Sequence, residues 1–380
     1  MRISNCSILV TGANGFIGKN LIVRLNELFN VRVITFVRGD EGTVSFTKLL
    51  SQADAIVHLA GENRPADEAA FEKVNYGLTK TLCLAIEEVF QSTNKHIPLI
   101  FASSIQAEHD NPYGRSKLAA EMEIMELVKR TNNPCIIFRF PGVFGKWCKP
   151  NYNSVVATFC YNIANNLPIN VNKSSSLLRL VYIEDVVETI LSSIKRAKLG
   201  LTQSKVKPEF LVSLTELSNQ IHAFSKYQSN LTVENVGAGF TRALYSTYVS
   251  YLPRKKFSYQ LTQNTDSRGV FVEMLKTTNS GQLSYFTALP GITRGGHYHH
   301  TKTEKFLVIR GEAHFRFRHL LTNELVEVRT NGESPRVVET IPGWIHDVTN
   351  IGKKELIVML WANEIFDKKK PDTVPRKVEK

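Results

Sequence analysis

Hydrophobic and polar positions alternate along the first half of the chain in a way that predicts short strands separated by helices. Between Ile8 and about residue 198, runs rich in β-branched and aromatic residues are followed by stretches with helical spacing. The strand runs read ILV, VRVITFV, AIVHLAG, PLIFASS and CIIFRFP. These runs are almost continuously apolar, which is typical of strands covered by helices on both faces. The pattern therefore predicts a doubly wound parallel α/β sheet.

The pattern weakens after residue 205 and changes after Phe257. Residues 205–256 contain one predicted helix, LTELSNQIHAFSKY, and a glycine-bearing connector. Beyond Phe257, strands alternate with glycine turns, which predicts a small all-β barrel or sandwich: VFVEMLK, GQLSYFTAL, KFLVIRGEAHFRFR, ELVEVRT, RVVETIP and ELIVMLWA. We expect one domain over residues 1–250 and a second over 257–370. The polar, proline-broken tail over 371–380 is expected to be solvated and mobile.

Composition narrows the class of protein. The 380 residues suit two domains, and no apolar run reaches the roughly 20 residues of a bilayer span. The sequence starts with a strand and a glycine turn, so we expect no export signal and a cytoplasmic location. Five cysteines without paired spacing predict buried thiols. The formal net charge of +12 suits nucleic acid, an anionic membrane or small anionic substrates, but no nucleic-acid recognition motif accompanies it. We therefore expect no nucleic-acid partner.

The first candidate site is the glycine turn TGANGFIG. It follows the strand run ILV and opens the helix KNLIVRLNELF. Glycines there let the backbone approach a pyrophosphate, and the helix N-terminus offers free N–H groups to the phosphates. The arrangement predicts a dinucleotide site of the Rossmann type. Its candidate contacts are Gly12, Asn14, Gly15, Phe16, Ile17 and Gly18, with Leu59 and Ala60 at the end of the third strand run.

The end of the second strand run indicates which dinucleotide binds. An acid there would hydrogen-bond the ribose hydroxyls and repel a 2′-phosphate. This run instead ends at Val37 and Arg38, although Asp40 and Glu41 lie only slightly further on. NADPH is therefore a better prediction than NADH.

Tyr113 and Lys117 form the second candidate feature. Their spacing at the start of a helix places the phenol and the ammonium on one face, one turn apart. A cation beside the phenol favours the phenolate, so Tyr113 is expected to exchange a proton with a substrate oxygen near neutral pH. Ser104, at the end of PLIFASS, is placed to hydrogen-bond the same oxygen, and Ser103 takes this role if the register differs by one residue.

Together these segments resemble the extended short-chain dehydrogenase/reductase family. The resemblance covers TGANGFIG, DAIVHLAG, VNYGLTKTL, the Ser-Tyr-Lys set and RLVYIEDVV, and so extends over about the first 250 residues. It implies catalytic roles for Ser104, Tyr113 and Lys117, with Lys117 also holding the nicotinamide ribose. It also implies a nucleotide-sugar substrate, with Asn151, Asn153 and Arg179 as candidate contacts.

The third candidate feature is a set of histidines in the β-rich half. His297 and His299 point to the same face of a predicted strand, and His346 arrives on a later strand. Glu304 has the wrong parity for an unbroken strand, but the Thr-Lys-Thr stretch before it can supply a turn. Three imidazoles and one carboxylate suit a divalent transition metal such as zinc. The sequence therefore predicts a metal site with room for water or substrate.

This second half resembles the cupins. Gly291, His297, His299, Glu304 and Gly311 fill the first cupin motif, and Pro342, Gly343, His346 and Asn350 fill the second, with the proline one residue closer to the glycine than usual. DSRGVFVE and RGGHY also resemble signatures of the metal-free deoxysugar 3,5-epimerases, which makes Arg268 and Arg294 candidate substrate contacts. In those epimerases the equivalent of His297 is a base, so His297 has two alternative roles here, base or ligand.

The whole chain resembles bifunctional capsular and O-antigen polysaccharide enzymes that make precursors of UDP-N-acetyl-L-fucosamine. The resemblance implies a UDP-4-keto-2-acetamido-2,6-dideoxyhexose substrate, C3 epimerisation by the cupin, and NADPH-dependent C4 reduction to the 6-deoxy-L-talose configuration. Two alternatives stay open: a reductase whose cupin is only a structural or dimerising barrel, and an NADP-binding redox sensor. By analogy with cupins we expect a homodimer.

Overall fold

The computed structural model describes residues 5–37, 45–171, 177–262, 264–266, 269–271, 274–277, 281–364 and 369–379. The chain divides into two compact units. The first comprises Met1–Ser154 and Leu178–Leu211, and the second comprises Val155–Leu177 and Val212–Lys380.

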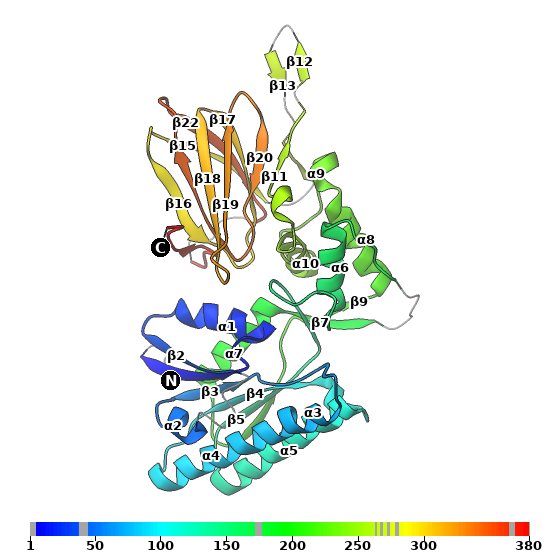
Figure 1. Cartoon of the computed structure of the whole chain (residues 1–380), viewed down its shortest axis with the longest axis vertical. Helices are drawn as coiled ribbons and strands as arrows, with labels where there is room; N and C mark the ends of the chain where they lie inside the picture. The colour runs from blue at the N-terminus through cyan, green and yellow to red at the C-terminus, as the bar shows by residue number, and fades with distance from the viewer. Residues whose placement is uncertain are drawn as a thin grey trace. The chain divides into compact units, whose positions relative to one another are not determined.

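A six-stranded parallel sheet forms the centre of the first unit (Figure 1). Its spatial order is β2 (Val31–Phe36), β1 (Cys6–Thr11), β3 (Ala55–His58), β4 (Leu99–Ser104), β5 (Cys135–Phe140) and β8 (Leu201–Ser204). The first five strands are the five apolar runs of the sequence, so the predicted Rossmann-type parallel sheet is confirmed. The sixth, β8, reads LTQS and was not predicted.

Helices cover both faces of this sheet (Figure 1). The helices of the first unit are α1 (Phe16–Asn26), α2 (Phe46–Leu50), α3 (Ala69–Phe71), the π-helix η1 (Glu72–Gly77), α4 (Leu78–Thr93), the 3-10 helix η2 (Ile105–Glu108), α5 (Pro112–Thr131) and α7 (Ile183–Arg196). Apolar faces of α2, α4 and α5 bury residues such as Leu82, Ile86 and Ile124 against the strands. Beside the main sheet lies a small one of β6 (Gly142–Phe144), β7 (Leu178–Tyr182) and β9 (Phe210–Val212).

Two five-stranded antiparallel sheets form most of the second unit. One has the order β11 (Ser258–Gln260), β20 (Arg336–Glu339), β17 (Glu304–Arg310), β22 (Leu356–Ala362) and β15 (Gln282–Ala288). The other has the order β19 (Leu325–Asn331), β18 (Glu312–His319), β21 (Trp344–Asn350), β16 (Thr293–Tyr298) and β23 (Val374–Pro375). Two short pairings complete the described strands: β10 (Thr232–Val233) with β14 (Lys276–Thr277), and β12 (Asn264–Asp266) with β13 (Gly269–Phe271). The antiparallel architecture agrees with the sequence pattern, and a closed cupin barrel stays a prediction.

Helices α6 (Val155–Ala164), α8 (Leu214–Ser225), α9 (Tyr227–Asn230) and α10 (Gly239–Val249), with the 3-10 helix η3 (Arg254–Lys256), belong to the second unit. A capping box of Ser213 and Glu216 starts α8. Ser246 of α10 donates a hydrogen bond to the carbonyl of Thr301 at 2.7 Å, and Tyr227 donates one to Glu339. The contacts therefore group residues 212–250 with the sheets, whereas the sequence pattern placed a domain boundary near residue 250.

The expectation of a mobile tail is wrong for residues 369–379. The segment forms β23, which pairs with β16, and Val378 is only 3% exposed. Arg318 donates hydrogen bonds to the carbonyls of Val378 and Lys377. The charged composition of the tail suggested solvation, but its backbone groups and one apolar side chain find partners on the sheet.

The structure also bears on the cysteines and on the lack of an apolar run long enough to span a bilayer. All five cysteines are buried and none forms a disulfide bond, as the sequence predicts. Among the described residues, none of the helices is both long enough and apolar enough to cross a bilayer.

Candidate active site and metal centre

The glycine turn links β1 to α1 at the carboxyl end of the parallel sheet. Gly12 has a φ of +68°, and a Cβ there would lie 2.6 Å from the backbone nitrogen of Ala60, so only glycine fits without displacement. Gly15 is the N-cap of α1, and no side chain caps the helix. The first-turn N–H groups are therefore available to an anionic ligand.

A cavity of about 540 Å³ opens beside this turn. It is lined by ten of the predicted cofactor and catalytic positions: Gly12, Asn14, Gly15, Phe16, Ile17, Gly18, Leu59, Ser104, Tyr113 and Lys117. Ala60 lines an adjoining cavity of about 190 Å³, which shares Gly12, Asn14 and Leu59 with the first. Arg38, on which the preference for NADPH was based, lies outside the described residues.

Ser104, Tyr113 and Lys117 all line the larger cavity. Asn111 caps α5 by accepting a hydrogen bond from the backbone of Gly114 at 2.8 Å, and Pro112 occupies the first turn, so the sequence itself starts the helix that carries Tyr113. Ser104 hydrogen-bonds Tyr113. Ser103 instead donates to the buried carboxylate of Glu121. The geometry thus places Ser104, rather than Ser103, beside the phenol.

The electrostatics of this trio differ from the sequence expectation. Burial raises the pKa of Tyr113, and its hydrogen bond with Ser104 offsets this only in part. Lys117 is 5% exposed, and burial lowers its pKa to about 8, although Glu121 opposes that shift. Its Nζ donates to the carbonyl of Ala102 at 2.9 Å. The expected lowering of the Tyr113 pKa by the neighbouring cation is therefore wrong, because burial of the phenol dominates.

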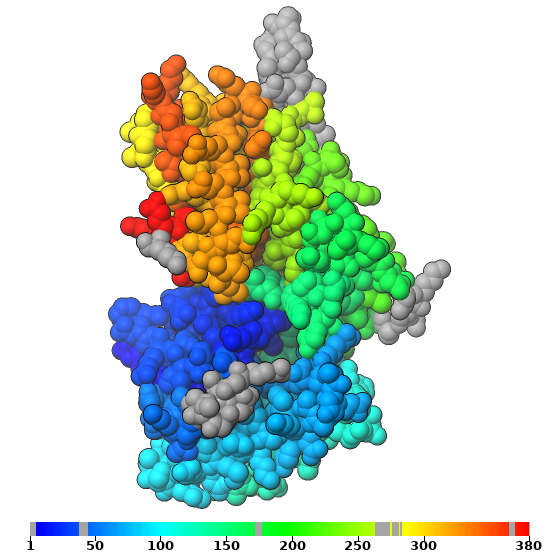
Figure 2. Space-filling view, in the orientation of Figure 1, coloured from blue at the N-terminus to red at the C-terminus, as the bar shows by residue number. Residues whose placement is uncertain are grey.

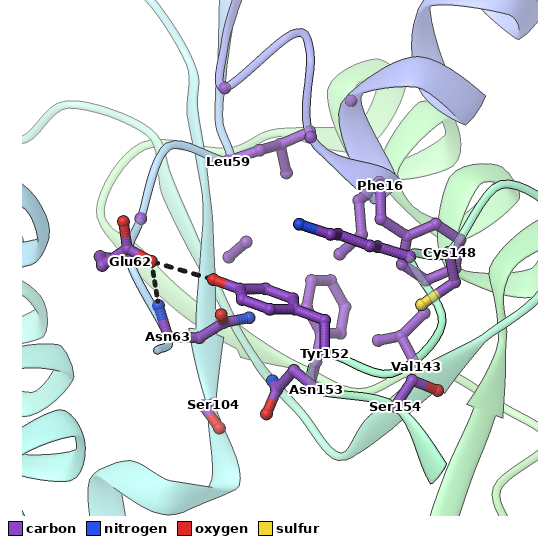
Figure 3. A pocket seen from close by; sticks show the side chains of 18 of the residues that line it. Phe16, Leu59, Glu62, Asn63, Ser104, Val143, Cys148, Tyr152, Asn153 and Ser154 are labelled. Atoms are coloured by element: carbon purple, nitrogen blue, oxygen red, sulfur yellow. Dashed lines mark hydrogen bonds between the residues drawn. The ribbon is translucent and has the colours of Figure 1, made fainter. Parts of the chain in front are cut away.

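The far wall of the cavity holds residues that the sequence did not single out (Figure 3). Tyr152 donates a hydrogen bond to Glu62 at 3.2 Å across the opening, and the backbone nitrogen of Asn63 donates to the same carboxylate oxygen. Asn75 fixes this strand end by accepting from the Glu62 backbone at 2.7 Å. Glu62 follows the third strand at the carboxyl edge of the sheet, so the rule that ligands bind there could have identified it.

The candidate sugar contacts separate in space. Asn153 lines the cavity beside Tyr113. Asn151 lies in the same loop with a left-handed φ of 52°. Arg179 lines a different cavity, of about 280 Å³, where it pairs with Glu209. Arg268 lies outside the described residues. Of the candidates in this unit, Asn153 is the one that lines the cavity of the catalytic trio.

The four predicted metal ligands come together in the second unit. One donor atom from each of His297, His299, Glu304 and His346 lies within 4.8 Å of the others. His297 lies near the end of β16, after a register shift between Gly295 and His297, Glu304 starts β17 after the predicted turn, and His346 lies on β21. The cluster thus joins both antiparallel sheets. Nε2 of His299 lies 3.1 Å from Oε2 of Glu304, and Nε2 of His346 lies 3.4 Å from it.

The protonation states of this cluster suit a divalent cation. Burial lowers the pKa of His297 to about 3 and also lowers the pKa of His346. Burial alone would raise the pKa of Glu304, but the adjacent His299 and His346 hold it well below its usual range. Among the described residues, neither ring nitrogen of His346 has a hydrogen-bond partner of good geometry, although the ring is 4% exposed. Imidazoles that burial keeps neutral at His297 and His346, together with the ionised carboxylate of Glu304, are donors of the kind that zinc or a similar ion requires.

A cavity of about 190 Å³ adjoins the cluster. It is lined by His297, Glu304 and His346, together with Arg294. The guanidinium of Arg294 lies 5.2 Å from the ring centroid of Phe286 and donates to the carbonyl of Thr287 at 2.8 Å. A cation thus borders the opening beside the histidines, where it can meet an anionic ligand.

Family comparisons agree with this division of the chain. A family model described as NAD dependent epimerase/dehydratase family matches residues 8–206, and one described as Polysaccharide biosynthesis C-terminal domain matches residues 264–374. The chain belongs to the NAD dependent epimerase/dehydratase family. It is 50% identical over 366 residues to UDP-2-acetamido-2,6-beta-L-arabino-hexul-4-ose reductase from Pseudomonas aeruginosa, an alignment covering 96% of this chain and 97% of the relative.

Solved structures show the same relationship. The capsular polysaccharide assembling protein CapF from Staphylococcus aureus superposes with a TM-score of 0.65 at 39% identity, covering 98% of this chain and 100% of that one. UDP-glucuronic acid 4-epimerase from Bacillus cereus in complex with NAD gives a TM-score of 0.51 at 19% identity, covering 58% of this chain and 84% of that one. At this identity the second likeness shows only the fold of the part of the chain that it covers.

Proposed function

We propose that the protein is a bifunctional nucleotide-sugar enzyme of capsule or O-antigen synthesis. Its cupin part, residues 257–370, inverts C3 of a UDP-4-keto-2-acetamido-2,6-dideoxyhexose. Its reductase part, residues 1–250, then reduces C4 with NADPH to UDP-2-acetamido-2,6-dideoxy-L-talose. The observation that carries the proposal is the relative at 50% identity, named as a reductase of a UDP-linked hexul-4-ose, whose alignment spans 96% of this chain.

The reduction depends on the Ser104, Tyr113 and Lys117 trio. NADPH, when bound along the glycine turn, supplies a hydride to C4. Tyr113 donates its phenolic proton to the C4 oxygen, while Ser104 hydrogen-bonds the same oxygen and holds the carbonyl in place. The raised pKa of Tyr113 keeps its proton available for this transfer. Lys117 provides positive charge beside the phenol, which stabilises the phenolate left behind.

The epimerisation depends on the acidity that the 4-keto group gives to the neighbouring C3 proton. A divalent metal, proposed to be zinc, would supply positive charge that stabilises the enolate by several kcal/mol. His297, His299, Glu304 and His346 are the residues that would hold it. Arg294 at the mouth of that cavity is suited to an anionic group of the nucleotide sugar.

Proton exchange separates the two activities. The purified protein is incubated with the UDP-4-keto-sugar in deuterated buffer and followed by proton NMR, first without and then with NADPH. We expect loss of the C3 proton signal before NADPH is added, and a reduced product only afterwards. A substrate that keeps its C3 proton without NADPH but is reduced with it would reject the epimerase activity and leave a reductase with a structural cupin.

The remaining parts of the proposal need separate measurements. A redox sensor would bind NADPH without consuming it, and the presence of Tyr113 and Lys117 in one pocket favours turnover instead. We also propose that the protein is located in the cytoplasm and forms a homodimer. Sedimentation equilibrium of the full chain would test the dimer.

A further inference from the structure

The C-terminal segment lies against the loop that carries a metal-ligating histidine. In Figures 1 and 2 the red end of the chain lies beside the yellow and orange strands of the second unit. Asp372 accepts hydrogen bonds from three consecutive backbone N–H groups, those of His300, Thr301 and Lys302, at 2.9, 2.6 and 2.7 Å. The Thr301 hydroxyl donates a fourth at 2.9 Å. One carboxylate therefore holds the whole turn between β16 and β17.

The same residue contacts His299 directly through its backbone. Nδ1 of His299 hydrogen-bonds the carbonyl oxygen of Asp372. A carbonyl oxygen can only accept, so Nδ1 must carry the proton. In the neutral ring the other nitrogen, Nε2, carries the lone pair, and Nε2 is the atom that lies 3.1 Å from Oε2 of Glu304 within the ligand cluster. The contact thus selects the ring tautomer and the ring orientation that a metal ligand needs.

Strand pairing ties the segment to a second ligand. Pro375 pairs with His297 in the β16–β23 ladder, and the backbone nitrogen of Arg376 donates to the carbonyl of Gly296 at 2.8 Å. The segment therefore contacts the end of β16, where His297 lies in the strand and His299 directly follows it. Hydrogen bonds from the turn to the Asp372 carboxylate and strand pairing with β16 thus both attach the segment to the ligand-bearing part of the chain.

We propose that Asp372 is a positioning residue of the metal site, which fixes the tautomer and orientation of His299 through its carbonyl and its carboxylate. This inference rests on the proposed metal site. Residues 371–379 are accordingly part of that site and not an appendage. The chemistry of the contact predicts that loss of the Asp372 carboxylate loosens the turn and lets the His299 ring rotate.

Metal affinity of the full-length protein tests this directly. Metal-free wild-type and Asp372→Ala proteins are titrated with Zn²⁺ against a chromophoric chelator, and with Co²⁺ while the visible ligand-field bands are recorded. We expect Asp372→Ala to bind Zn²⁺ about 10- to 100-fold more weakly, the usual effect of removing an outer partner of a ligating histidine, with an altered Co²⁺ spectrum. Asp372→Asn keeps one acceptor oxygen, so an intermediate loss is expected.

A matched control lies in the same segment. Glu379 is an exposed tail carboxylate that pairs with Arg316, so Glu379→Gln tests loss of a tail charge without touching the turn. It should bind both metals as the wild type does. NADPH affinity should be unchanged in all three variants, which shows that each is folded.

The possible results distinguish failure of the Asp372 role from failure of the proposed metal site. If wild-type protein binds neither Zn²⁺ nor Co²⁺, the metal site itself is rejected. If the wild type binds both, and Asp372→Ala and Asp372→Asn match its affinity and its Co²⁺ spectrum, the positioning role is overturned. A purely structural role would lower the melting temperature of the metal-free protein and leave the Co²⁺ spectrum unchanged, which also overturns it. If Asp372→Ala does not fold, Asp372→Asn alone decides.

Discussion

The two candidate sites are built in opposite ways. The cavity of the first unit, about 540 Å³, lies beside a glycine turn and an uncapped helix start, and Ser104, Tyr113 and Lys117 are among the residues that line it. The cluster of the second unit is made by four side chains from two sheets, beside a cavity of about 190 Å³. The first arrangement suits an extended ligand whose phosphates meet backbone N–H groups, whereas the second presents converging donors to a single ion.

The two sites also differ in how burial shifts the pKa values of their side chains. In the first site burial leaves a cation that titrates near neutrality, since the pKa of Lys117 falls to about 8. In the second site burial removes positive charge, since the pKa of His297 falls to about 3. The first environment suits proton transfer to a substrate oxygen, and the second suits lone-pair donation to a cation. Variants that affect one site and spare the other test this separation.

Tyr113→Phe should have the largest effect. Removing the phenolic proton leaves the C4 oxygen without its acid, so NADPH oxidation is expected to slow by about 100- to 10,000-fold. The measurement is stopped-flow absorbance of NADPH with the keto-sugar at saturation. Deuterium exchange at C3 should proceed at the wild-type rate, because the phenol belongs to the other site. Unchanged NADPH consumption would show that another group protonates the substrate.

His346→Gln is expected to have the next largest effect, on the opposite activity. Loss of one imidazole leaves an incomplete donor set around Glu304, so we expect metal content to fall and C3 exchange to slow by about 100-fold or more. Metal analysis of the purified protein and NMR exchange measure both. NADPH binding, followed by fluorescence, should match the wild type. Normal exchange by a metal-depleted variant would contradict the role given to the cluster.

Two glycines offer a smaller and more sharply matched comparison. Gly12→Ala places a Cβ 2.6 Å from a backbone atom, so we expect NADPH binding to weaken by about 1 to 3 kcal/mol as the turn shifts. Gly291→Ala also has a positive φ, +77°, but its Cβ would meet nothing within 4 Å. It should cost only about 1 kcal/mol of stability and leave NADPH affinity unchanged. Equal effects of both on NADPH binding, measured by calorimetry, would show that close approach at Gly12 is unimportant.

Local patterns were enough to predict much of this molecule. The apolar strand runs and the glycine turn predicted five strands of the parallel sheet and the cavity beside it. Parity along one strand, with a turn before Glu304, predicted the histidine cluster. Each of these inferences uses spacing within a short segment, where backbone geometry fixes the relation between residues.

The features that the sequence missed depend on distant partners. The strand β8 is polar, and it joins the sheet only through pairing with β5. Arg179 was grouped with the sugar contacts, but its ion pair with Glu209 draws it toward another cavity. The tail appeared solvated because its charges are visible in the sequence, whereas the three N–H groups that hold Asp372 are not. The sequence shows that burying a charged side chain costs free energy. It does not show which distant group will offset that cost by a hydrogen bond.

The smallest effect that we expect is a pH dependence of the first site alone. Above pH about 8 Lys117 loses its proton, so kcat/KM for NADPH, which reports ionisations of the free enzyme, should fall about tenfold per pH unit. Tyr113 should not contribute in this range, because burial raises its pKa. C3 exchange should show no break at this pH, since Lys117 is not part of the cluster that would support it.

Stability should respond to Lys117 with the opposite sign. The folded-state pKa of about 8 lies below the ordinary lysine value of 10.5, so between these values the unfolded chain binds more protons and the free energy of unfolding increases with pH. Lys117→Met should remove this contribution, on the order of 1 kcal/mol per pH unit, from denaturant-unfolding curves. An activity loss above pH 8 accompanied by an equal loss of stability in the wild type would point to general alkaline unfolding. Because Lys117 makes activity fall while its own contribution to stability rises, the two measurements together identify this residue.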